Sequence, residues 1–181
     1  NLLQEGIDRK KIFLTGHPIV QTVNQMLPKI QFSEIVQKLG LDSKGYALLT
    51  VHRAETVDDE KSLSTVINAL AMVPVPIVFP IHPRTKLRLK QFGLLEKALS
   101  MGIRTIEPCD YVATLRLIAD SAMVLTDSGG IQQECAILKT PCITLRSTTE
   151  WVETVKAGVN FLAPPEFPSI EFTVKKVYCN L

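Results

Sequence analysis

Residues 122–131, AMVLTDSGGI, join a short apolar run to a glycine-rich turn. The run Ala122–Leu125 is continuously apolar, which is typical of a strand covered on both faces. Residues Ile131–Leu138 follow as a helix. Thr126–Gly130 is therefore predicted to be the turn that joins a buried strand to a helix, the unit from which parallel α/β sheets are built.

The same alternation of short apolar runs and amphipathic stretches extends on both sides of this unit. Strands are expected at 12–14, 46–51, 77–81, 103–106, 122–125, 141–145 and 159–162, and helices at 19–27, 31–40, 58–70, 83–91, 94–99, 111–120, 131–138 and 149–157. This order predicts a doubly wound α/β domain with a mostly parallel, Rossmann-like sheet. The tail 166–181 is expected to be irregular.

Composition argues against several classes of partner. A net charge of +2 without a basic stripe does not indicate nucleic-acid binding. The apolar runs are far shorter than the roughly 20 residues of a membrane span, so no membrane partner is expected. The four cysteines form no CxxC pair and no ligand-like cluster with the three histidines. We therefore expect free thiols in a cytoplasmic protein and no metal site.

The turn at 126–130 has the chemistry of an anion site. Gly129 and Gly130 lack a β-carbon, so the backbone can approach a bulky anion closely and can adopt a positive φ. The helix beginning near Ile131 presents unpaired N–H groups and a partial positive charge, which favour phosphate. Ser128 adds a hydroxyl, and Glu134, one helical turn on, is placed to accept hydrogen bonds from a ribose. Without a Walker lysine or GxGxxG spacing, the alternative is a plain tight connection.

Polar side chains also follow three other predicted strands. They are His52, Arg53 and Glu55 after strand 46–51, His82 and Arg84 after strand 77–81, and Arg146 and Glu150 after strand 141–145. Ligands of open parallel sheets bind outside the carboxyl ends of the strands, so these residues are expected at one rim. Histidine carries protons and arginine binds phosphate with two hydrogen bonds. The alternatives are a backbone-bonded histidine at 52, a solvated arginine at 84 and a helix-start acid at 150.

Five ordered motifs resemble those of the non-hydrolysing UDP-N-acetylglucosamine 2-epimerases. They are TGHP (15–18), TVHRAE (50–55), FPIHPRT (79–85), TDSGGIQQE (126–134) and LR followed by TTE (145–150). The resemblance covers nearly the whole chain to about residue 162. It implies the C-terminal, UDP-binding half of a two-domain glycosyltransferase-B-like fold. Residues 1–18 would then be the interdomain crossover, 19–165 the UDP-binding domain and 166–181 the tail.

The resemblance also implies an activity. Members of the family invert C2 of UDP-GlcNAc to give UDP-ManNAc, by eliminating UDP and adding it back, without metal or nicotinamide cofactor. By position, His52 would be the catalytic-site histidine, Ser128, Gly129 and Gly130 would hold the diphosphate, and Glu134 the ribose. Arg53 and His82 would be rim contacts to phosphate or to the partner domain. The expected partners are a UDP-sugar, an N-terminal domain of the same protein and, in the full-length enzyme, a second copy.

Two positions depart from the family pattern. Thr114 stands where many members have an aromatic residue near the uracil, and residues 149–153 read TEWVE where many members read TERPE. The second variant is similar to relatives that act on other UDP-2-acetamido sugars, so the identity of the sugar stays open. Two other functions are compatible with the turn: the donor domain of a glycosyltransferase, and a non-catalytic nucleotide-sugar-binding module.

Overall fold

The sheet has the parallel, doubly wound arrangement that the sequence predicts. The computed structural model describes residues 2–180, and within them six strands form one sheet. The strands are β1 (Ala47–Thr50), β2 (Ile77–Pro80), β3 (Arg104–Ile106), β4 (Met123–Thr126), β5 (Cys142–Thr144) and β6 (Asn160–Leu162). Their order is β3-β2-β1-β4-β5-β6, and all neighbours are parallel. The direction of winding reverses between β1 and β4, which is where ligands of such sheets bind.

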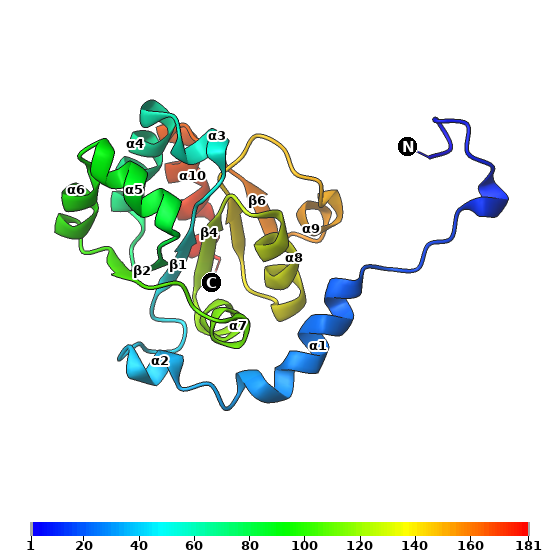
Figure 1. The fold of residues 1–181 in the computed structure, drawn as a ribbon, viewed down its shortest axis with the longest axis horizontal. Helices are drawn as coiled ribbons and strands as arrows, with labels where there is room; N and C mark the ends of the chain where they lie inside the picture. The colour runs from blue at the N-terminus through cyan, green and yellow to red at the C-terminus, as the bar shows by residue number, and fades with distance from the viewer. Residues whose placement is uncertain (1, 181) are drawn as a thin grey trace.

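Helices cover both faces of the sheet (Figure 1). One face carries α4 (Glu60–Ala69), α5 (Pro83–Gln91), α6 (Leu94–Ser100) and α10 (Phe167–Tyr178). The other carries α1 (Pro18–Ile30), α2 (Ile35–Lys38), α7 (Tyr111–Asp120) and α8 (Gly129–Leu138). The short elements are η1 (Arg9–Lys11), α3 (Ala54–Val57), η2 (Leu70–Met72) and α9 (Val152–Lys156).

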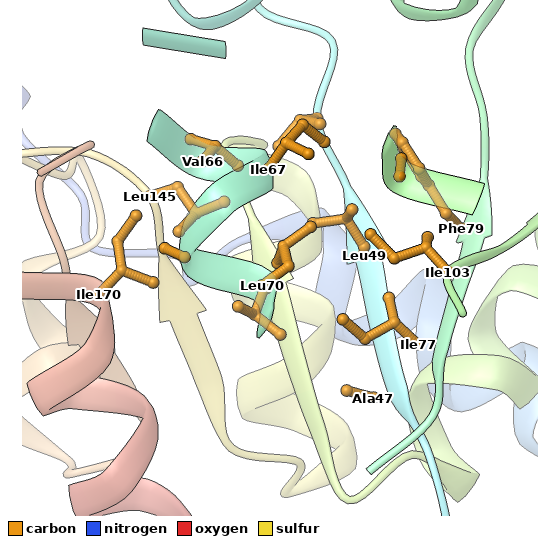
Figure 2. Packing of buried hydrophobic residues seen from close by; sticks show 14 of the residues in the cluster. Ala47, Leu49, Val66, Ile67, Leu70, Ile77, Phe79, Ile103, Leu145 and Ile170 are labelled. Atoms are coloured by element: carbon orange, nitrogen blue, oxygen red, sulfur yellow. The ribbon is translucent and has the colours of Figure 1, made fainter. Parts of the chain in front are cut away.

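Strand β1 shows why its sequence is apolar without alternation. Successive side chains of a strand point to opposite faces, and here both faces are packed. Ala47 and Leu49 belong to the cluster beneath α4 and α10, part of which Figure 2 shows. Leu48 and Tyr46, the residue just before the strand, belong to the cluster beneath α7 and α8, where the Tyr46 hydroxyl donates a hydrogen bond of 2.7 Å to the carbonyl of Leu117.

Side chains and proline mark the starts of several helices. Asp59 caps α4 and Asp110 caps α7, each accepting a hydrogen bond from a backbone N–H of the first turn. His82 caps α5 in the same way, with Pro83 at the first helical position. A residue that caps a helix after a strand lies at the carboxyl end of that strand. His82, which follows β2 and caps α5, is therefore a polar group at the carboxyl edge of the sheet.

Two expected elements near the N-terminus are wrong. Residues 12–14 form no strand, because no neighbouring strand pairs with them, and Phe13 and Leu14 are 78% and 101% exposed. The helix expected at 31–40 shrinks to α2, which ends at Lys38, two residues before Gly40 with its φ of +59°.

The expectation of an irregular tail at 166–181 is also wrong, although Leu181 lies outside the described residues. Helix α10 occupies most of this stretch. Its residues Ile170, Val174 and Val177 recur at helical spacing and are buried in the core cluster that also contains α4. The packed α/β unit of the chain therefore continues through α10.

Three further properties of the described residues concern helix length, metal-ligating side chains and cysteines. Among residues 2–180, no helix is long and apolar enough to cross a membrane. No group of three or more metal-ligating side chains was found there either. Cys135 and Cys142 are buried free thiols, Cys109 is half-buried and Cys179 is exposed.

Candidate functional site

The carboxyl ends of β1 and β4 bring two of the predicted motifs together. Thr50 is in register with Thr126, and their hydroxyls lie 2.6 Å apart. The residues that follow them, His52 and Asp127, therefore lie side by side at the switch point of the sheet. Sequence reasoning placed both motifs at one rim, and the register shows which residues are adjacent.

Asp127 links the two strand ends, a role that sequence reasoning missed. Its side chain is 0% exposed and its carboxylate accepts hydrogen bonds from the backbone N–H groups of His52, at 3.0 and 3.2 Å, and Arg53, at 2.9 Å. The His52 ring nitrogen Nδ1 lies 3.6 Å from Oδ1 of the same carboxylate. The signal in the sequence was an acidic residue directly after a buried strand. A carboxylate buried there needs hydrogen-bond donors, and neighbouring backbone N–H groups can supply them.

The N-terminus of α8 has no side-chain cap, and polar side chains lie close to it. Ser128 is the N-cap residue, but its hydroxyl makes no capping hydrogen bond with the helix. A β-carbon on Gly129 would lie 3.2 Å from Trp151 Nε1, 3.8 Å from Arg53 Nη2 and 3.8 Å from Glu150 Oε2. Neither Gly129 nor Gly130 has a positive φ, so glycine serves here to leave room rather than to permit an unusual backbone.

Two arginines and two glutamates form a ring of ion pairs beside this helix end. Arg53 lies 3.4 Å from Glu150 and 3.9 Å from Glu55, and Arg146 lies 2.9 Å from Glu150 and 3.5 Å from Glu55. The pKa of Glu150 lies below its ordinary value, because its own backbone amide and Arg146 donate hydrogen bonds to it. Arg53, Glu55 and Glu150 are partly exposed, so the pairs of Arg53 contribute little stability and its guanidinium remains available to another anion.

His82 and Arg84 take different positions. The ring of His82 lies 5.9 Å from that of His52, and its Nδ1 accepts a hydrogen bond from the Arg84 backbone N–H at the start of α5. The Arg84 guanidinium instead pairs with Asp58, which also accepts from Arg88 at 2.9 Å. The structure thus brings His82 to the site and engages Arg84 in a separate ion-pair cluster.

Glu134 lies on α8 one turn after the glycines and is 6% exposed. Burial raises the pKa of its carboxyl, and a hydrogen bond from Tyr111 opposes that shift. Burial and the neighbouring Glu134 in turn raise the pKa of Tyr111 to about 12. A carboxylate held at a site despite this cost is a good candidate for binding hydroxyl groups of a ligand.

Replacement of this carboxyl is expected to change stability with pH. Because the folded protein binds the proton of Glu134 more tightly than the unfolded chain, stability falls as pH rises from the ordinary pKa of 4.5 through the raised folded value. Glu134→Gln removes that cost, so its free energy of unfolding relative to wild type should increase across this window. Urea unfolding at several pH values measures it, with exposed Glu5→Gln as control. A flat or falling difference would contradict the assignment.

Trp151 connects the predicted crossover segment to the glycine turn. Its indole packs edge-to-face on the ring of His17, with centroids 5.2 Å apart, and its Nε1 borders Gly129. The sequence showed Trp151 only as a departure from the family pattern. Its contacts depend on two loops that are distant along the chain, so local patterns could not reveal them.

A family model and several similar proteins indicate one family. The family model described as UDP-N-acetylglucosamine 2-epimerase matches residues 1–180. The UDP-N-acetylglucosamine 2-epimerase of Methanocaldococcus jannaschii is 44% identical over 171 residues, covering 90% of this chain and 46% of the relative. The UDP-2,3-diacetamido-2,3-dideoxy-D-glucuronate 2-epimerase of Pseudomonas aeruginosa is 36% identical, covering 90% and 45%.

A solved structure extends the likeness to three dimensions. The M. jannaschii UDP-GlcNAc 2-epimerase in complex with UDP-GlcNAc and UDP superposes with a TM-score of 0.88 at 38% identity, covering 98% of this chain and 51% of that one. The chain thus spans about half the length of the relatives it matches. The strand–turn–helix unit at 122–138 and its neighbours therefore have the fold of an epimerase, and the chain belongs to the UDP-N-acetylglucosamine 2-epimerase family.

Proposed function

We propose that this chain binds the UDP part of a UDP-2-acetamido sugar in an enzyme that interconverts UDP-GlcNAc and UDP-ManNAc. The observation that carries the proposal is the uncapped N-terminus of α8 at Gly129, with the buried carboxyl of Glu134 on the same helix and His52 at the adjoining strand end. A helix N-terminus favours a diphosphate, and a carboxylate one turn on suits a ribose.

The proposed chemistry is elimination of UDP with loss of the C2 proton, which leaves a 2-acetamidoglucal, followed by return of UDP to C1 and of a proton to the opposite face of C2. Elimination breaks the bond between C1 and the diphosphate oxygen, so negative charge grows on the diphosphate. Ser128 and the amides of Gly129 and Gly130 would stabilise that charge, together with Arg53 once a phosphate displaces Glu150 from it. His52 would carry a proton within the same site.

The second wall of the cleft is proposed to come from the rest of a full-length protein, because this chain spans about half the length of its relatives. Reaction at C2 needs groups held on both sides of the sugar. We therefore expect this chain alone to keep part of the affinity for UDP and almost none of the rate. With four free cysteines, we place the reaction in the cytoplasm.

Two measurements test the proposal. In deuterated water, the full-length protein should convert UDP-GlcNAc to UDP-ManNAc and leave deuterium at C2. The epimerase activity would be ruled out if no UDP-ManNAc formed and no deuterium entered at C2. In this chain, titrated UDP should shift the amide signals of Gly129, Gly130 and Ile131, and should leave that of Gly102, which precedes β3 at the amino edge, in place. Unmoved amides at millimolar UDP would contradict the anion site.

A further inference from the structure

We infer that Asp127 is a positioning residue that holds the imidazole of His52 in one tautomer and at one place relative to the diphosphate turn. The inference rests on the proposed function, because it concerns the histidine assigned to proton transfer there. It adds a role for a buried residue outside the ion-pair ring.

Asp127 sits between two functional segments and cannot move independently of either. Its backbone N–H donates to the carbonyl of Thr50 at 3.2 Å, which ties it to the end of β1. The carbonyl of Thr126, the residue before it, accepts from Leu145 at 2.8 Å, which ties it to the end of β5. Ser128 and Gly129 follow immediately, so the carboxylate and the N-terminus of α8 belong to the same rigid turn.

The carboxylate holds the backbone and the ring of His52 at the same time. Oδ2 accepts from the amides of His52 and Arg53, and Oδ1 accepts from the His52 amide and faces the ring at 3.6 Å. Contacts of this length commonly shorten when a ligand binds. An acceptor facing Nδ1 favours the tautomer that carries its proton there and leaves Nε2 directed away from the carboxylate.

A purely structural role would need only the backbone hydrogen bonds. The ring contact is separate from them, because it is made by a side chain that is 44% exposed and not by the backbone N–H groups. The two roles differ in a measurable property. If Asp127 only holds the backbone of the loop, the tautomer of His52 stays at its solution preference. If Asp127 positions the ring, the tautomer changes.

The chain contains its own reference histidines. In His17 and His82, Nδ1 accepts a hydrogen bond of 3.2 Å from a backbone N–H, of Ile19 and Arg84 respectively. Their neutral rings must therefore carry the proton on Nε2. With three histidines in all, the ring nitrogens of each can be resolved in a single labelled sample.

The experiment measures ¹⁵N shifts of the histidine rings in this chain at about pH 9, above the ordinary titration range of histidine. We expect the Nδ1–H form in His52 and the Nε2–H form in His17 and His82. In Asp127→Asn, His52 should move towards Nε2–H while the two references and the shifts of Gly129 and Gly130 on adding UDP stay as in wild type. In the full-length protein, the same variant should lower kcat about 10- to 100-fold and leave KM nearly unchanged.

Each outcome separates the claims. An Nε2–H form of His52 in wild type, or a tautomer unchanged in Asp127→Asn, would overturn the positioning role even if UDP binds. Absent amide shifts with UDP would count against the proposed function and not against the tautomer. If Asp127→Asn does not fold, the wild-type tautomer alone decides: Nδ1–H supports the role and Nε2–H refutes it.

Discussion

Replacing His52 by Gln in the full-length protein is expected to lower the rate of deuterium exchange at C2 by roughly 10²- to 10⁴-fold, the usual contribution of a positioned proton-transfer group. The fold should survive, because the hydrogen bonds to Asp127 come from the backbone N–H groups of residues 52 and 53 and the side chain is 44% exposed. UDP affinity should change by less than about threefold, since no part of the helix end of α8 is altered.

Exchange at C2 is followed by mass spectrometry of the recovered UDP-sugar, and UDP affinity by titration of the same variant. Lys61→Gln, an exposed change on α4, serves as control and should keep the wild-type rate. A rate of exchange within tenfold of wild type would show that His52 does not transfer the proton. A loss of UDP affinity that matches the loss of rate would instead make His52 a ligand of the phosphate.

Gly129→Ala is expected to weaken UDP binding about 30-fold, or about 2 kcal/mol, within the usual cost of overpacking a close-fitting site. The added β-carbon would lie 3.2 Å from Trp151 Nε1 and would fill space between the helix end and Arg53. The loss would be specific to binding, because alanine is a better helix former than glycine and the thermal midpoint should not fall.

The neighbouring glycine provides the matched comparison. A β-carbon on Gly130 would meet only the Ser128 hydroxyl, at 3.9 Å, which is an ordinary contact. Gly130→Ala should therefore weaken UDP binding clearly less than Gly129→Ala when both are titrated by calorimetry. Equal losses of UDP affinity in the two variants would indicate that the diphosphate lies over both residues. An unchanged affinity in Gly129→Ala would indicate that the diphosphate does not bind at this turn.

Several features of the fold could be predicted from local patterns. The central strands, their alternation with helices and the parallel sheet follow from the period and continuity of apolar residues, as in 46–51 and 122–125. The expected strand at 12–14 failed because an apolar run becomes a strand only where another strand offers hydrogen bonds. Helix α10 was not predicted, although its apolar residues Ile170, Val174 and Val177 have helical spacing. The reason is that these residues are buried only because the core that they cover lies far away in the sequence.

The sequence by itself determined which chemical groups follow each strand: histidines, arginines and the glycine turn are local consequences of chain order. Tertiary structure decided which of them meet. The adjacency of β1 and β4 places Asp127 against His52, while Arg84 pairs with Asp58 away from the turn. Such pairings depend on strand order and on loops that are far apart in the chain. A buried charge such as that of Asp127 needs partners, and the residues that can act as partners come close only when the sheet has formed.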